Sequence, residues 1–140
     1  MDLNVALSAN FKEMRNHAFE DFVKNHETYR GWMVDLLRNE YTVLITARNI
    51  KWAFPTLRRI YETTGWIPND ALFNDTGIDG SNAPAIKQTQ LERRVFPRYG
   101  DNLKQYYAID SNANTRDMYT KMGIQAFDCE REGSWLTLPF

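Results

Sequence analysis

The sequence has little of two residue types that often carry metal or redox chemistry. It contains one cysteine, Cys129, and two histidines, His17 and His26, among 140 residues. A single cysteine excludes an internal disulfide framework and a multi-cysteine zinc site, and it is typical of a reducing compartment. Both histidines lie in a polar stretch, nine positions apart. We therefore expect them to be solvated surface residues rather than ligands or bases.

Long apolar runs and an excess of charge of one sign are also absent. No run approaches the ~20 residues of a membrane span, and the N-terminus lacks the charged-then-apolar pattern of a secretory signal. The 17 Lys+Arg and 18 Asp+Glu residues give a net charge of −1, which argues against wholesale electrostatic wrapping of nucleic acid. With 43% apolar and 25% charged residues, the chain is expected to form one soluble, cytoplasmic domain over residues 1–140.

The charges are nevertheless distributed unevenly. Segment 41–60 contains four basic residues and no acid, whereas segment 61–80 contains four acids and no base. The candidate nucleic-acid-binding residues near this basic segment are Lys51, Trp52, Arg58 and Arg59. A second basic and aromatic group comprises Arg93, Arg94, Arg98 and Tyr99. Cations can contact phosphates and aromatic rings can stack on unpaired bases; the alternative is that rings pack inward and arginines face water.

Apolar periodicity predicts helices alternating with short strands. Helices are expected from about 10 to 22, after 28, and over 55–64, 85–98 and 114–122, and strands over 42–46, 71–73, 106–110 and 124–127. The strand over 42–46 has no polar alternation, which is typical of a strand buried on both faces of a parallel sheet. Residues 47–49 are expected to form a turn and residues 74–84 a loop. This order predicts a parallel α/β sheet flanked by helices.

Ligands of open parallel sheets bind at the carboxyl ends of the strands. Thr46 and Asp110 stand at two such ends, and Lys87 opens a helix just after the Gly- and Asn-rich loop. Thr46 can hydrogen-bond a phosphate oxygen, Lys87 can neutralise its charge, and Asp110 can hold a divalent cation. Such a set suits phosphoryl transfer. Each residue also has a purely structural alternative. Thr46 could reflect β propensity, Lys87 could be a solvated lysine on a helix, and Asp110 could be the N-cap of the next helix.

The order of these segments resembles a known family. Val43-Leu-Ile-Thr-Ala-Arg48, Lys87 before a helix, and Tyr107-Ala-Ile-Asp-Ser-Asn112 followed by Arg116-Asp-Met-Tyr119 and Met122-Gly-Ile124 resemble motifs II, III and IV of the haloacid dehalogenase (HAD) superfamily. Within it, the chain is most similar, over roughly residues 29–127, to the 3'-phosphatase domains of bacteriophage-type polynucleotide kinase/phosphatases. The resemblance implies a three-layer HAD-like (Rossmann-like) parallel sheet flanked by helices, without a cap domain, and Mg²⁺-dependent chemistry on a phosphate ester.

The family's motif I, Asp-x-Asp-x-Thr, can match only Asp2-Leu-Asn-Val-Ala6. By that match Asp2 is the nucleophile and, with Asp110, a Mg²⁺ ligand, while Asn4 stands at the general acid/base position. The expected substrate-binding residues are Thr46, Arg48 and Lys87. Three groups depart from the pattern: Asn4 cannot shuttle a proton, Ala6 replaces Thr, and Ser111 replaces the usual second acid of motif IV.

The segment around Asp2 leaves two structural alternatives, since only Met1 precedes it in the sequence. Either Leu3 to Leu7 forms the first strand and there is no motif I, or a short stub keeps Asp2 near the site.

Two functions follow from these alternatives. One is a phosphatase-like domain of nucleic-acid metabolism that recognises or hydrolyses a phosphorylated nucleotide or nucleic-acid end. The other is a catalytically inactive relative that binds nucleic acid or a protein partner through its basic surfaces. The tail with Trp135, Leu136 and Leu138 is expected to be a partner-docking strand or a segment laid over the fold.

Overall fold

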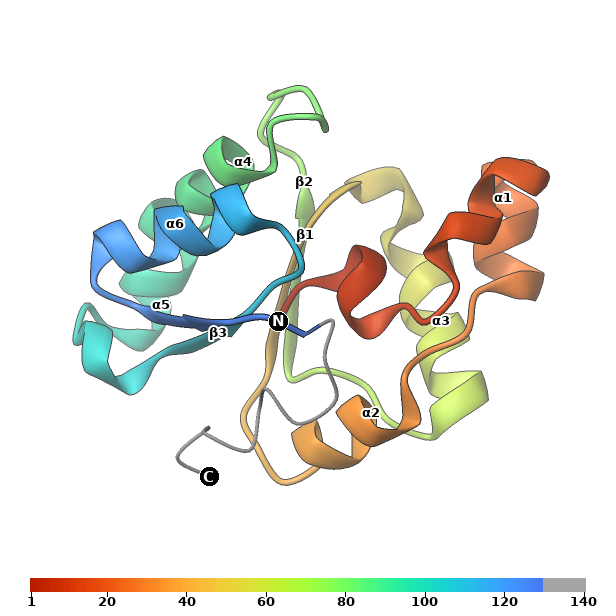
Figure 1. Ribbon diagram of the computed structural model, residues 1–140, viewed down its shortest axis with the longest axis horizontal. Coiled ribbons are helices and arrows are strands. Elements are labelled where there is room, and N and C mark those ends of the chain that lie inside the picture. Colours follow the sequence, from red (N-terminus) through yellow and green to blue (C-terminus); the bar gives the residue numbers. More distant parts are fainter. Residues whose placement is uncertain (130–140) are drawn as a thin grey trace.

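Short parallel strands lie at the centre of the molecule, with helices on both sides (Figure 1). The structure, a computed structural model, describes residues 1–129, so Trp135, Leu136 and Leu138 lie outside the described residues. The strands are β1 (Val43–Asn49), β2 (Asp70–Asn74), β3 (Tyr107–Ile109) and β4 (Gln125–Phe127). Within the described residues they form two two-stranded parallel sheets, β1–β2 and β3–β4. The predicted mixed α/β class is confirmed. The two sheets are smaller than the single sheet of the expected three-layer fold.

The helices follow the predicted order along the chain. The α-helices are α1 (Phe19–Asp21), α2 (Gly31–Leu37), α3 (Ala53–Thr64), α4 (Ala83–Gln90), α5 (Phe96–Tyr99) and α6 (Ala113–Met122). Shorter or wider helical turns are η1 (Leu3–Leu7), η2 (Phe11–Asn16), η3 (Phe22–His26), η4 (Ile50–Trp52), η5 (Leu91–Val95) and η6 (Leu103–Gln105). The expected stops of α3 and α6 are confirmed, because Gly65 and Gly123 adopt left-handed φ values of 70° and 93°. Within residues 1–129 no helix has the length and apolar character to cross a membrane.

Two local predictions were wrong. The helix expected from about Asn10 is interrupted, because His17 (ψ 157°) and Ala18 (ψ 140°) have extended backbones between η2 and α1. The break folds the chain back so that the Phe11 ring meets Phe22 edge-on, with centroids 6.1 Å apart. Residues 47–49 are not a turn: β1 continues to Asn49, which pairs with Asn74 of β2 after a register irregularity.

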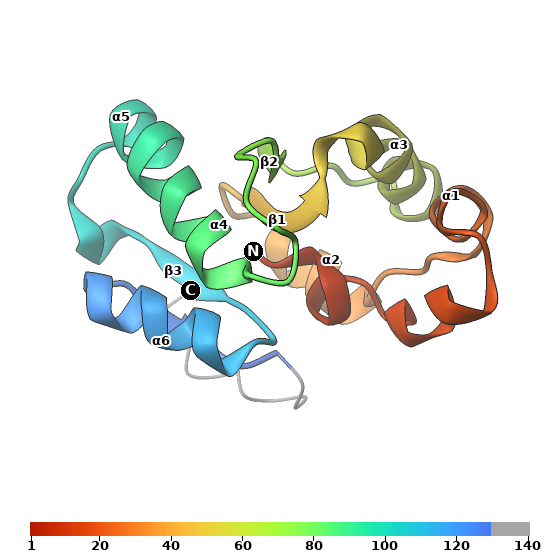
Figure 2. The same cartoon turned by 90° about the horizontal axis from the view of Figure 1, so that it is seen from above.

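The alternation of side chains along the strands builds two cores. Leu44 of β1 and Ile109 of β3 face a cluster that includes residues of η1, α2 and α3. Their neighbours Ile45 and Ala108 face a second cluster, formed with η5 and α6. Seen from above, α4, α5 and α6 lie on one side of the strands and α1, α2 and α3 on the other (Figure 2). Burial on both faces is the reason that 42–46 reads as an unbroken apolar run.

The first two residues connect the two sheets. The Met1 amino group donates to the Val43 carbonyl at 3.0 Å, and Ile45 N–H donates to the Met1 carbonyl at 2.9 Å. On the other side, Asp2 N–H donates to the carbonyl of Ile109 at 2.9 Å. Met1 and Asp2 therefore lie between β1 and β3 in extended form, and the next residues turn away as η1. Leu3 to Leu7 is not a strand but a turn, in which Asn4 (ψ 128°) and Val5 (φ 66°) depart from helical backbone angles.

Replacing Ile60 with Ala tests the core beneath α3. Ile60 is fully buried, and its neighbour Tyr61 is 60% exposed. We expect Ile60→Ala to lower the free energy of unfolding by about 2–5 kcal/mol, because the cavity relaxes only partly. Tyr61→Ala, as a matched control on the same helix, should stay within about 0.5 kcal/mol of the wild type. Urea unfolding measures both; equal effects would contradict this packing.

Candidate active site

A buried lysine joins two carboxylates that are far apart in the sequence. Lys87 Nζ lies 2.8 Å from Asp2 Oδ1 and 2.5 Å from Asp110 Oδ2. The side chains of Lys87 and Asp110 are 2% and 1% exposed, and that of Asp2 is 8% exposed. The sequence prediction that these three residues share one site agrees with this geometry. With all three charged, the cluster carries a net negative charge and so favours a cation.

Each member is fixed by the element that carries it. Asp110 follows β3 directly, and its Oδ1 accepts the backbone N–H of Asn112 at 2.9 Å. Asn112 in turn caps α6 by accepting from Thr115 N–H at 3.1 Å. Lys87 lies in α4, whose first turn is capped by Asn82. Asp2 is held beside the end of β3 by its own backbone N–H. The site therefore lies at the carboxyl ends of the strands, as expected.

Oxygen atoms gather on the outer side of Asp2. The hydroxyl of Ser111, half-buried, donates to Asp2 Oδ2 at 3.0 Å and lies 3.3 Å from the carbonyl oxygen of Asn4. Mg²⁺ takes oxygen ligands at 2.0–2.1 Å in an octahedron, whose neighbouring ligands are about 3 Å apart. The Asp2 carboxylate and the Asn4 carbonyl, at 3.0 Å and 3.3 Å from the Ser111 hydroxyl, are oxygen donors of the kind that Mg²⁺ takes, and the Asp110 carboxylate lies on the other side of the Lys87 ammonium.

Burial and charge shift the ionisation of the cluster. Burial and the Asp2 carboxylate raise the pKa of Asp110, and the Lys87 ammonium opposes that rise. Burial alone would lower the pKa of Lys87, but Asp2, Tyr119 and Asp110 together hold it above its usual range. Burial raises the pKa of Tyr119, and the Lys87 ammonium opposes that rise. Lys87 is therefore a fixed positive charge at neutral pH.

Arg48 forms a second buried ion pair beside the first. Its Nη2 lies 2.6 Å from Glu27 Oε2, and its Nη1 donates to Glu27 Oε1 at 2.9 Å, with both side chains 0–1% exposed. Nη1 also donates to Thr56 Oγ1, and Nη2 donates to Asn4 Oδ1 at 2.9 Å. The guanidinium thus positions the Asn4 side chain. Sequence reasoning assigned Arg48 to substrate; in this arrangement its terminal nitrogens are already bonded within the protein.

Strain marks the turn that follows Asp2. Val5 has φ 66°, and it is the one non-glycine residue with positive φ among the described residues. A β-branched side chain disfavours that region, at a cost on the order of 1–3 kcal/mol. Arg30 holds the turn by donating to the carbonyls of Ala6 at 2.8 Å and Val5 at 3.0 Å. The strained backbone keeps the Asn4 carbonyl next to Ser111.

Thr46 is not shown in contact with the carboxylates. It is fully buried, and its Oγ1 accepts the backbone N–H of Arg48 at 3.1 Å. Its assignment to phosphate stays a prediction.

Most of the basic side chains on the two candidate nucleic-acid-binding surfaces form ion pairs or hydrogen bonds within the protein. Arg58 pairs with Glu62 at 2.7 Å, and Arg59 donates to the backbone carbonyl of Glu27 at 2.9 Å. Lys51 Nζ lies 5.2 Å from the Trp52 ring centroid. In the second group Arg94 pairs with Asp75, and Arg98 and Tyr99 both donate to Asp70. These contacts weaken the sequence argument for nucleic-acid binding at either surface.

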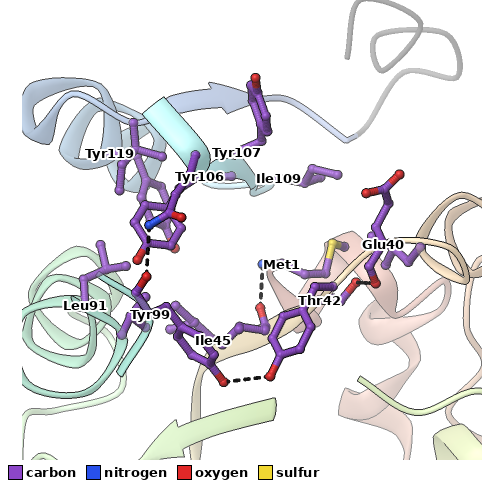
Figure 3. A pocket seen from close by; sticks show the side chains of 17 residues that line it. Met1, Glu40, Thr42, Ile45, Leu91, Tyr99, Tyr106, Tyr107, Ile109 and Tyr119 are labelled. Carbon is purple, nitrogen blue, oxygen red and sulfur yellow. Dashed lines mark hydrogen bonds between the residues drawn. The ribbon is translucent and has the colours of Figure 1, made fainter. Parts of the chain in front are cut away.

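A cavity of about 650 Å³ lies between β1 and β3 and is lined by residues of both strands and by Met1. Figure 3 shows Ile109 of β3 above the cavity and Ile45 of β1 below it, with Tyr106 and Tyr99 to their left. Its lining is mainly apolar, and none of Asp2, Lys87 or Asp110 contributes to it. The cavity lacks the charged groups of the Lys87 cluster, so we place the candidate site at the lysine.

Several residues of the site escaped sequence reasoning. Glu27 and Arg30 lie in a segment of ordinary composition, and nothing in the local pattern distinguishes a buried acid from a surface one. Tyr119 was quoted in the motif on the helix after β3, but no role at the site was assigned to it. Ser111 could have been found from the sequence, because it follows Asp110 at the position where the HAD motif IV has its second acid.

Comparison of the chain with protein-family models, with curated proteins and with solved structures finds no match. The function is therefore argued from the geometry of the site.

Removing the bridging ammonium tests the electrostatics of the site. Lys87→Met leaves Asp2 and Asp110 buried and uncompensated, which we expect to cost about 3–5 kcal/mol at pH 7.5. The pKa of Asp110, already raised, should rise further, so the native variant takes up a proton that the unfolded chain does not. Its deficit should therefore shrink as the pH falls towards 5. Urea unfolding at several pH values measures this.

Lys24→Met provides the control, since Lys24 pairs with Glu20 on the surface with half of its side chain exposed. It should change stability by less than about 1 kcal/mol at every pH. A Lys87→Met deficit that does not change with pH would contradict the proposed charge balance.

The Arg48–Glu27 pair predicts a second large effect. Glu27→Gln removes the charge that Arg48 faces and should cost about 3–5 kcal/mol in urea unfolding. The exposed counterpart Glu62→Gln, which breaks the Arg58 pair, should cost less than about 1 kcal/mol. Similar losses in the two variants would show that burial does not set the strength of the inner pair.

Proposed function

We propose that the chain is a HAD-like domain with a Mg²⁺-dependent site for phosphate esters. This site recognises, and slowly hydrolyses, the phosphorylated end of a nucleotide or nucleic acid. The observation that supports this most strongly is the buried contact of Lys87 with both Asp2 and Asp110. A lysine between two aspartates can bind a phosphate oxygen once a divalent cation compensates the carboxylates.

The arrangement of the strands supports the same proposal. Hydrogen bonds give the order β4, β3, Met1–Asp2, β1, β2, with Asp2 in the central position. Ligands of parallel α/β sheets bind at the carboxyl ends of the strands, and Asp2 lies there in the central position. Fold alone does not determine activity, so the proposal depends on the side chains.

Mg²⁺ fits the residues present. Asp2, Asp110, the Asn4 carbonyl and the Ser111 hydroxyl would hold it, and the ion would neutralise charge on the phosphate. An oxygen of the Asp2 carboxylate attacks phosphorus, and the bond from phosphorus to the leaving oxygen breaks. The alcohol departs, and water then hydrolyses the aspartyl-phosphate, regenerating the carboxylate and releasing phosphate.

Asn4 makes this reaction slow. No carboxyl stands at its position to protonate the leaving oxygen or to activate water, so both protons come from or go to solvent. Loss of general acid–base help usually forfeits about 10²–10⁴-fold in rate. Binding of the phosphate by Lys87 does not require that proton transfer, so recognition survives where turnover is weak.

Restoring the missing carboxyl tests the proposed function. We expect Asn4→Asp to raise the rate of hydrolysis of a 3'-phosphorylated oligonucleotide, and of p-nitrophenyl phosphate, by roughly 10²-fold in Mg²⁺. Asp2→Ala should abolish turnover in both backgrounds. Asp35→Asn, at an exposed acid with a 75% exposed side chain, is the matched control and should leave the rate unchanged.

Turnover that persists in Asp2→Ala would refute the proposed hydrolysis by Asp2. Absence of turnover from both the wild type and Asn4→Asp would also refute it. In the second case, salt-dependent binding of the oligonucleotide would support the inactive binding module instead. Lys51→Ala and Arg58→Ala would then report whether the basic surface carries that binding.

A further inference from the structure

Two histidines and an aspartate meet at the surface of the N-terminal region: His17 follows η2, Asp21 ends α1, and His26 ends η3. His26 Nε2 lies 3.0 Å from Asp21 Oδ2, and His17 Nδ1 lies 3.7 Å from the same oxygen. The two imidazole rings are stacked, with centroids 3.8 Å apart and an interplanar angle of 16°. The sequence predicted solvated surface residues rather than ligands or bases, and the structure brings the two histidines together.

We propose that His17, Asp21 and His26 form a transition-metal site, with Zn²⁺ as the ion that suits them best. Two imidazole nitrogens and one carboxylate oxygen are borderline ligands that favour Zn²⁺ and its neighbours over Mg²⁺. Tetrahedral Zn²⁺ with bonds of 2.0–2.1 Å places its ligand atoms about 3.3 Å apart. The two distances to Asp21 Oδ2 lie on either side of that value, and all three ligand atoms lie within 4.8 Å of one another.

The carboxylate is oriented for this role. Asp21 Oδ1 accepts from the side-chain amide of Asn25 at 2.8 Å, which leaves Oδ2 directed at the histidines. Outer partners of this kind fix ligand orientation in metal sites.

The backbone around His26 is also held. The Asn10 side chain donates to the His26 carbonyl at 2.7 Å and accepts the backbone N–H of Thr28 at 2.9 Å. The three ligand side chains are between a quarter and a half exposed, so water can complete the coordination sphere.

Bound metal would fasten the end of η2, α1 and η3 to one another. This segment leads directly into Glu27, which holds Arg48 and, through it, Asn4. In Figures 1 and 2, α1 lies on the far side of the strands from α4 and α6, so this metal site is separate from the Lys87 cluster. The proposal does not depend on phosphatase activity.

Zinc titration of the full chain tests the proposal. After treatment with chelator, the protein should bind one Zn²⁺ per chain by calorimetry, and a hundredfold excess over Kd should raise Tm by about 5 °C or more. Millimolar Mg²⁺ should not compete. His17→Gln and His26→Gln should each weaken binding by more than the roughly 10–100-fold that loss of an outer partner costs.

Matched controls separate this site from the other acids. Asp35→Asn, and Asp2→Ala in the candidate active site, should retain the Zn²⁺-induced rise in Tm. Because the chain has only two histidines, imidazole ¹⁵N shifts of the wild type identify the ligands even where a variant fails to fold. Zn²⁺ binding that leaves both imidazoles unshifted, or no binding below about 100 μM, would overturn the proposal.

Discussion

The contact between the Lys87 ammonium and the carboxylates of Asp2 and Asp110 is the interaction on which the rest of the site depends. It ties the first residues of the chain, helix α4 and the end of β3 to one point. Buried ions are costly to desolvate, and removal of one partner leaves the others uncompensated. An apolar trio of similar volume would meet the needs of stability at least as well. Stability alone therefore does not require these charges, and the proposed function gives them a role.

The neighbourhood of this contact combines features of a working site with one conspicuous loss. Strain at Val5, the hold of Arg30 on the turn, and the buried Arg48–Glu27 pair all position groups around Asn4. Such costs persist where the surrounding structure maintains them for a purpose. Yet Asn4 offers an amide where proton transfer needs a carboxyl. These features agree with the proposal of a site that binds a phosphate and a cation but turns over an ester slowly.

Much of the fold was predictable because its signals are local. The unbroken apolar run over 42–46 predicted a strand buried on both faces, and Leu44 and Ile45 do face different cores. Gly65 and Gly123 marked helix ends through their left-handed backbones. The grouping of Asp2, Lys87 and Asp110 followed from the resemblance together with strand-end logic. The partnership of Glu27 with Arg48, and the meeting of His17 with His26, depend on how the chain folds back at Ala18, which no local pattern encodes.

The most direct test of the account is whether Asp2 and Lys87 bind a phosphoryl group together with Mg²⁺. Beryllium fluoride forms a stable mimic of aspartyl-phosphate on a nucleophilic carboxylate, and ¹⁹F NMR detects it without any turnover. We expect protein-bound ¹⁹F resonances for the wild type in Mg²⁺, and their loss in Asp2→Asn and in Lys87→Met under conditions where each variant is folded. Absence of bound resonances from the wild type, or identical resonances in Asp2→Asn, would contradict the assignment of this cluster as a phosphate site.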